Sequence, residues 1–227
     1  MKKYVIILTT VIGLVFVSCN INDIVSEVAN GKITAKEKLG EVINKAKSDF
    51  ASDAKLAVIY GRDISTSGEI DLLGDNVASN FYYVVQSDSV ASINPLEANQ
   101  FYIPVFKSDP VRSPLTVSDI LSFVKDQTAK DIMDGAFGVI GTVGISTSAS
   151  YSDSPAALSS ALGTDAAKTF RALYPASQID MYLFPSKSIS DSLGTENSAD
   201  WVVNFYSSNS SLVLWISTGH GVVQLSN

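Results

Sequence analysis

The chain carries one histidine and one cysteine, and this scarcity limits the chemistry it can perform. His220 lies between Gly219 and Gly221, which is typical of a turn between two strands. A serine hydrolase would need a nucleophile motif such as Gly-x-Ser-x-Gly, and the sequence has none. Zinc sites draw on several cysteines and histidines, so a zinc site is excluded. We therefore expect no catalytic centre and no cofactor.

Carboxylates gather in one short stretch of the first half of the chain. Hard oxygen ligands of this kind are what calcium accepts, although the spacing differs from that of an EF-hand loop. Acidic residues beside glycines are also ordinary turn composition, and a solvated turn is the favoured interpretation. The glycines from Gly138 to Gly144 do not have the dinucleotide-binding spacing and indicate a linker. The question of a calcium site stays open for Glu69, Asp71 and Asp75.

The N-terminus has the order of a bacterial lipoprotein signal peptide. Two lysines precede an uncharged run from Tyr4 to Val17, and the small residue Ser18 comes just before Cys19. The run is too short to remain as a membrane span. The segment Phe16–Cys19 resembles the lipobox of bacterial lipoproteins. We predict a signal peptide over residues 1–18 and lipid attachment at Cys19; an ordinary secretory signal with an incidental cysteine is the alternative.

Charge and cysteine content restrict the compartment and the partners. Residue 20 is Asn rather than the aspartate associated with inner-membrane retention, so we expect export and lipid anchoring in the envelope at the outer membrane. A lone cysteine allows no internal disulfide, so the core alone must hold the fold. The net charge of −7 comes without any Lys/Arg-rich stretch. Because phosphate binding needs clustered positive charge, nucleic acid is not an expected partner.

Hydrophobic periodicity predicts two long helices, each followed by strands. Thr34 and Glu37 have the capping-box spacing, and apolar residues then recur at helical intervals over about 34–52. Ser154 precedes a proline that suits a first helical turn, and one apolar face continues to Pro175. Shorter helices are expected at 21–28 and 117–124, and a loop over 135–154. Runs of β-branched and aromatic residues predict strands at 56–60, 81–86, 101–106, 179–184, 201–206, 212–216 and 222–225.

The two halves repeat this pattern at one separation. Marker residues recur 120 positions apart, namely Phe50 with Phe170, Leu73 with Leu193 and Phe81 with Trp201. We interpret the repeat as a tandem duplication. The expected fold class is α+β, with each module made of two helices and an antiparallel sheet of three or four strands. The modules are placed at residues 19–110 and 111–227.

A family resemblance follows from the second copy. Its helix ends in Tyr174-Pro-Ala-Ser177, and a later strand reads Trp201-Val-Val-Asn-Phe-Tyr206 before a Ser/Asn turn. This order resembles the tandem PepSY-like modules of envelope lipoproteins, and the layout is similar to the β-lactamase inhibitor protein. The resemblance implies a binding or inhibitory module. No protease domain follows the modules, and no inhibitor residue can be carried over by number.

Strand alternation separates the aromatic residues into two faces. Phe81 and Trp201 are expected to face the helices, and Tyr82, Tyr206 and Trp215 to lie on an outward sheet face that could hold a partner. Core packing with scattered surface tyrosines is the competing interpretation. The sequence favours a non-catalytic, membrane-anchored module that binds or inhibits another envelope or secreted protein. A small-molecule or glycan-binding lipoprotein is the alternative, and a hydrolase a distant third.

Overall fold

The computed structural model describes residues 31–71, 74, 76, 78–87, 89, 100–104, 110–112, 121–138, 145 and 149–226. Several predictions from the sequence fall elsewhere in the chain. The signal peptide, Cys19, the short helix at 21–28, Leu73 and Asp75 lie outside the described residues. None of the helices in the described part of the chain is long and apolar enough to cross a membrane.

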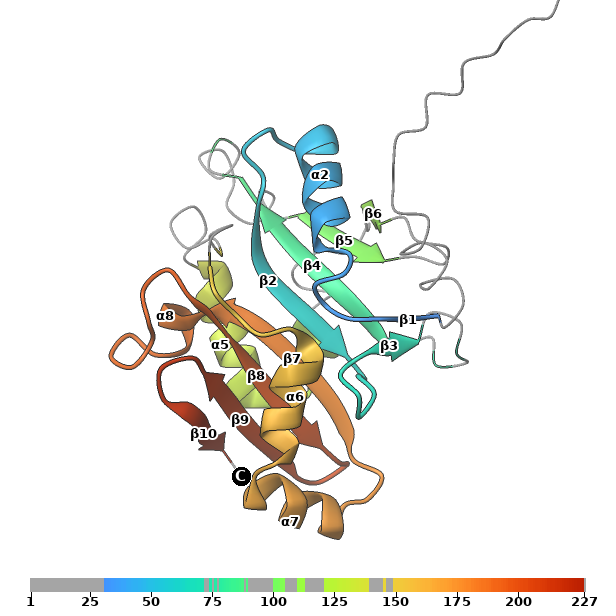
Figure 1. Ribbon diagram of the computed structural model, residues 1–227, viewed down its shortest axis with the longest axis vertical. Helices are drawn as coiled ribbons and strands as arrows, with labels where there is room; N and C mark the ends of the chain where they lie inside the picture. The colour runs from blue at the N-terminus through green and yellow to red at the C-terminus, as the bar shows by residue number, and fades with distance from the viewer. Residues whose placement is uncertain are drawn as a thin grey trace, which may run out of the picture.

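The fold is built on one eight-stranded antiparallel sheet (Figure 1), in the order β10-β9-β8-β7-β2-β4-β5-β6. A mixed α+β fold with antiparallel pairing, as the sequence predicts, is therefore confirmed. A second sheet pairs only β1 (Lys32–Ile33) with β3 (Ile70–Asp71). The eight strands are β2 (Lys55–Arg62), β4 (Asn80–Gln86), β5 (Gln100–Pro104), β6 (Pro110–Arg112), β7 (Gln178–Pro185), β8 (Ala199–Tyr206), β9 (Ser211–Ser217) and β10 (Gly221–Ser226).

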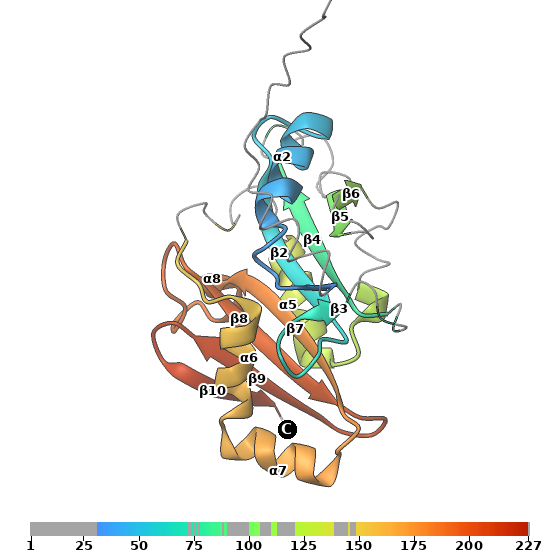
Figure 2. The same ribbon diagram turned by 45° about the vertical axis from the view of Figure 1, so that its right-hand side comes forward.

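Helices cover both faces of this sheet, giving three layers (Figure 2). The first face packs against α2 (Leu39–Asp49), α6 (Ser154–Leu162) and α7 (Asp165–Leu173). The second face packs against α5 (Gln127–Gly138), α8 (Ser186–Ile189) and the helical residues 121–123. Each face therefore has its own hydrophobic core.

The expectation that helices cover only one face of the sheet is wrong. Helix α5 occupies part of the region where the sequence predicts a loop, and Asp126 accepts a hydrogen bond from the backbone N–H of Ala129 at 3.0 Å. This is an ordinary N-terminal cap. The strands also agree with two covered faces, because β2, β4, β7 and β8 are buried along almost their whole length rather than at alternate positions.

Local hydrogen bonds explain why both long helices differ from the periodic pattern. Helix α2 begins at Leu39 although Glu37 accepts from the Thr34 N–H at 2.6 Å, because the Thr34 hydroxyl donates to Asp153 instead of capping its own helix. The second predicted helix is two helices. Thr164 accepts a hydrogen bond from the Ala167 N–H at 3.2 Å and so caps a new helix, α7.

The two halves of the sheet meet at a short junction. We call β2, β4, β5 and β6 the first half-sheet and β7 to β10 the second. β2 and β7 pair over three positions only, Ile59–Gly61 against 181–183. Beyond them, the Ile64 N–H donates to the Ile179 carbonyl at 2.7 Å. The sheet thus crosses the boundary expected between the modules.

Candidate functional site

Two of the three residues expected on an exposed binding face are buried. Tyr82 is 6% exposed and Trp215 is 1% exposed. The Trp215 indole N–H donates to Asp200 Oδ2 at 3.1 Å, inside the fold. Only Tyr206 is partly exposed. The predicted open face is therefore wrong for Tyr82 and Trp215, because the layer containing α5 and α8 covers that side of the sheet.

Three tyrosines form a stack inside the core between the sheet and the layer of α5 and α8. Tyr60 lies against Tyr182 with ring centroids 5.0 Å apart and planes 2° apart, and against Tyr82 at 5.6 Å. Tyr182 continues the stack to Phe184 at 5.9 Å. Because these rings come from three adjacent strands, they tie the half-sheets together across the junction.

A buried carboxylate lies beside this stack. Asp180, on β7, is completely buried. Its Oδ2 accepts from the Tyr60 hydroxyl at 3.0 Å, and its Oδ1 accepts from the Asp63 N–H at 2.8 Å. Longer contacts reach the hydroxyls of Tyr182 at 3.4 Å and Tyr206 at 3.5 Å. Burial raises the pKa of Asp180 to about 6, with the Asp63 N–H and the Tyr60 hydroxyl opposing part of that shift.

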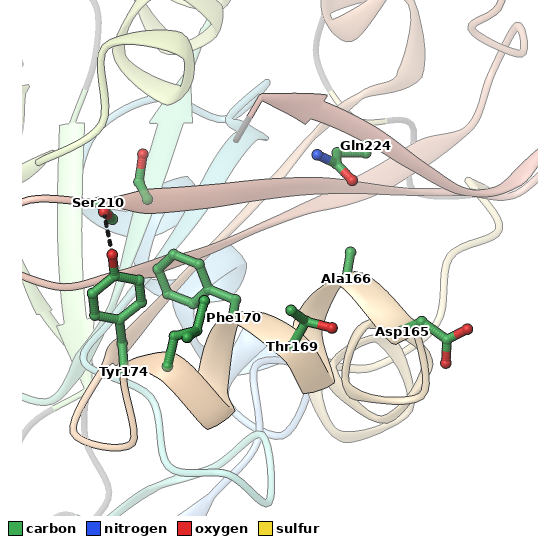
Figure 3. A pocket seen from close by; sticks show the side chains of 9 residues that line it. Asp165, Ala166, Thr169, Phe170, Tyr174, Ser210 and Gln224 are labelled. Carbon is green, nitrogen blue, oxygen red and sulfur yellow. Dashed lines mark hydrogen bonds between the residues drawn. The ribbon is translucent and has the colours of Figure 1, made fainter.

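A groove of about 600 Å³ lies between α7 and the last two strands, and we call it the α7 groove. Figure 3 shows Phe170 and Tyr174 extending from α7 toward Ser210, with Gln224 on the opposite wall. The Ser210 hydroxyl donates to the Tyr174 hydroxyl at 2.9 Å. The same groove is lined by Leu173, a large apolar side chain that is 70% exposed.

The α7 groove adjoins a strand edge. Gln224 belongs to β10, which pairs with β9 on one side and, within the described residues, with no strand on the other. The strand is largely accessible to solvent. Its register with β9 shifts between Gln224 and Ser226, where a bulge interrupts the ladder. Apolar and hydroxyl side chains therefore lie next to an open row of backbone donors and acceptors.

Two smaller hollows are also present, and the first shares Ser210 and Ser211 with the α7 groove. One, of about 460 Å³, is lined by Lys125, Tyr206 and the turn 207–211 between β8 and β9. The other, of about 480 Å³, follows α2 and is lined in part by Lys36, Lys55 and Tyr151. The Lys36 ammonium lies 4.1 Å from the centre of the Tyr151 ring. Among the described residues, neither hollow is lined by a residue of β10.

Of the three residues that the sequence suggests for calcium, Glu69 and Asp71 are described and Asp75 is not. Glu69 Oε2 accepts from the Ser67 hydroxyl at 2.7 Å, and Asp71 belongs to β3. In the described part of the chain, no group of three or more His, Cys, Asp or Glu side chains could hold a metal ion. His220 lies in the β9–β10 turn, as expected, with its ring 6.4 Å from that of Trp215.

The apolar helix face that the sequence predicts up to Pro175 includes both Phe170 and Leu173. In the structure Phe170 is buried, but Leu173 is exposed on α7. The sequence does mark the break between the two helices: Gly163 is a residue type that ends helices, and Thr164 is one that caps the start of the next. Comparisons with protein-family models, with curated proteins and with solved structures find no match for this chain.

Proposed function

We propose that this chain is a non-catalytic binding protein that holds an extended segment of a partner protein along β10, with partner side chains entering the α7 groove. The observation that carries the proposal is the exposed Leu173 beside an open strand edge. An added strand gains backbone hydrogen bonds, and a neighbouring groove selects its side chains. Inhibition of that partner, as the PepSY-like resemblance implies, belongs to the same proposal.

The composition of the groove indicates which segment fits. Phe170, Leu173 and the ring of Tyr174 offer an apolar wall, and Thr169, Ser210, Ser211 and Gln224 offer hydrogen-bonding groups. Asp165 stands at one end. We expect a partner strand that alternates apolar and polar residues, because strand side chains point alternately to the two faces of a sheet.

A small polar ligand or glycan is the second candidate, and one observation favours it. Tyr206 lines the 460 Å³ hollow beside Lys125, Ser208 and Asn209, all of which are exposed. An accessible tyrosine ring next to hydrogen-bonding side chains suits a polyhydroxylated ligand. This hollow shares Ser210 and Ser211 with the α7 groove but is not lined by Leu173 or Gln224, so variants at those two positions separate the two candidates.

Site-specific photo-crosslinking tests the protein-binding proposal. We expect Leu173→p-benzoylphenylalanine, irradiated in cells that express the full chain, to give one discrete protein adduct, because a partner strand on β10 passes over this side chain. The matched control is Leu193, the other large apolar residue that is exposed among the described residues; it is 45% exposed and does not line the groove. Adducts are identified by mass spectrometry.

A second substitution in the groove completes the test. In a chain that carries the photo-crosslinking residue at position 224, the further substitution Leu173→Asp should reduce the adduct by more than about tenfold, as expected when an interface anchor is lost. Leu193→Asp should leave it unchanged. Equal adducts at 173 and 193, or none at either, would contradict partner binding in the groove.

We further propose that Cys19 carries a lipid that anchors the chain in the envelope, at the outer membrane. The charged start, the short apolar run and Ser18 support this assignment. Radiolabelled palmitate should enter the protein and be lost in Cys19→Ser, measured by autoradiography of immunoprecipitated protein. A mature form that is unlabelled and released to the medium would contradict it.

The tandem duplication is also a proposal. Phe81 and Trp201, 120 residues apart, are both buried on the same face of the sheet. Phe81 stands on β4 opposite Gly61, and Trp201 stands on β8 opposite Leu183, so each lies on the second strand of its half-sheet. The junction pairs Tyr60 with Tyr182, as a two-fold relation between copies would require.

A further inference from the structure

Asp180 is the polar link between the half-sheets at one end of their junction. It belongs to the second half-sheet, whereas its two shortest hydrogen bonds come from the first, from the Tyr60 hydroxyl and the Asp63 N–H. Asp63 directly follows β2 and has a positive φ of 50°, a conformation that costs energy for a residue other than glycine. The bond to Asp180 helps to hold the chain in that turn.

Besides the Tyr60–Tyr182 stack, few hydrogen bonds among the described residues hold this end of the junction. The β2–β7 ladder has three pairs, followed by the bond from the Ile64 N–H to the Ile179 carbonyl. The other hydrogen bonds between the halves, among the described residues, lie away from this end. The Ile145 N–H meets the Leu56 carbonyl at the opposite end of β2, and the Thr34 and Ala35 bonds to Asp153 and Ser154 lie at the start of α6.

The surroundings of Asp180 supply hydrogen bonds but little opposite charge. Facing it are the hydroxyls of Tyr60, Tyr182 and Tyr206, the carboxylate of Asp63, and the guanidinium of Arg62. That guanidinium lies 4.6 Å over the Phe123 ring. Directly across the β7–β8 ladder stands Asn204, completely buried, with neither side-chain polar atom hydrogen-bonded to a described residue.

We propose that Asp180 is a proton-controlled clasp: the protonated carboxyl keeps the Asp63–Ile64 end of the half-sheet junction closed, and its ionisation lets that end open. An ionised carboxylate in this site lacks the hydration it has in water. Opening the turn after β2 restores that hydration while the other bonds between the halves stay in place.

The direction of the pH dependence follows from linkage. Burial raises the pKa of Asp180 to about 6, from an ordinary value of 3.8. A raised pKa means that the closed state binds the proton more tightly than an open state in which Asp180 is hydrated. The stabilisation is fully present below about pH 4 and is lost as the pH rises to about 6, beyond which it changes no further.

Hydrogen exchange on the full chain tests the clasp. Protection of the Asp63 and Ile64 amides, corrected for intrinsic exchange, should fall about 100-fold between pH 4 and pH 7, because two pKa units correspond to two factors of ten. In Asp180→Asn the fall should vanish. Amides of β8 and β9 serve as an internal reference that should not follow this profile.

Two further variants control for loss of a buried group. Asp200→Asn removes another buried carboxylate of the same face, which accepts from Thr218 and Trp215 away from the junction, and should leave the profile unchanged. Tyr60→Phe removes a donor that favours ionisation and should move the midpoint to higher pH. An Asp180→Asn variant that keeps the wild-type profile, or a Tyr60→Phe midpoint that does not move, would overturn the proposal.

Discussion

Trp201→Ala is expected to lower the free energy of unfolding by about 3–5 kcal/mol. Trp201 is 1% exposed in the core between the sheet and helices α2, α6 and α7, and its indole N–H donates to the Ser152 carbonyl at 2.8 Å. Alanine would leave a large cavity and an unpaired carbonyl beside the start of α6. Urea unfolding followed by circular dichroism measures the change.

The control for this prediction is Trp201→Phe, which keeps an aromatic ring but loses the indole donor. It should cost about 1–2 kcal/mol, since the lost hydrogen bond accounts for about 1 kcal/mol and the smaller ring for the remainder. A loss below about 1 kcal/mol in the alanine variant would mean that the core around Trp201 is not packed as described.

Gly68→Ala is expected to destabilise the fold by about 2–4 kcal/mol, combining a strained backbone with a steric clash. Gly68 has a φ of +83°, and an added Cβ would lie 2.5 Å from the Pro155 Cα and 2.7 Å from the Pro155 nitrogen. Both are backbone atoms, so no side-chain rotation relieves the contact. The loop after β2 and the start of α6 would have to separate. Thermal and urea unfolding report the loss.

Gly221 provides the matched control for Gly68. It also has a positive φ, +71°, but nothing lies within 4 Å of an added Cβ. Gly221→Ala should therefore show only the backbone penalty, about 1–2 kcal/mol. If the two variants lose the same stability, the close approach of Gly68 to Pro155 does not contribute.

The strands could be predicted from the sequence because their signals are local. The runs around Tyr60, Tyr83, Met181 and Val203 are continuous and apolar, and the structure forms β2, β4, β7 and β8 there. The same continuity should have predicted two covered faces. A face open to water needs polar residues at alternate positions, and these strands carry few.

What the sequence could not show depends on contacts between distant segments. The pairing of β2 with β7 and the three-dimensional neighbours of Asp180 join residues about 120 positions apart. Strand alternation correctly places Tyr82, Tyr206 and Trp215 on one face of the sheet. It does not show that the layer containing α5 covers that face. Asp180 lies within the strand predicted at 179–184, and no local signal relates it to Tyr60 or to Asp63.

The short junction between the half-sheets has a consequence for the order of folding. β7, β8, β9 and β10 are consecutive in the chain and neighbours in the sheet, so they are joined by short connections: residues 186–198, which include α8, residues 207–210 and residues 218–220. β2 can meet β7 only after a loop of more than 100 residues has closed, and such closure is slow relative to hairpin formation. We therefore expect β7 to β10 to form early and the joining of β2 to β7 to come late. Until that step is complete, each half-sheet presents an apolar strand edge, the stage at which the chain is most exposed to aggregation and proteolysis.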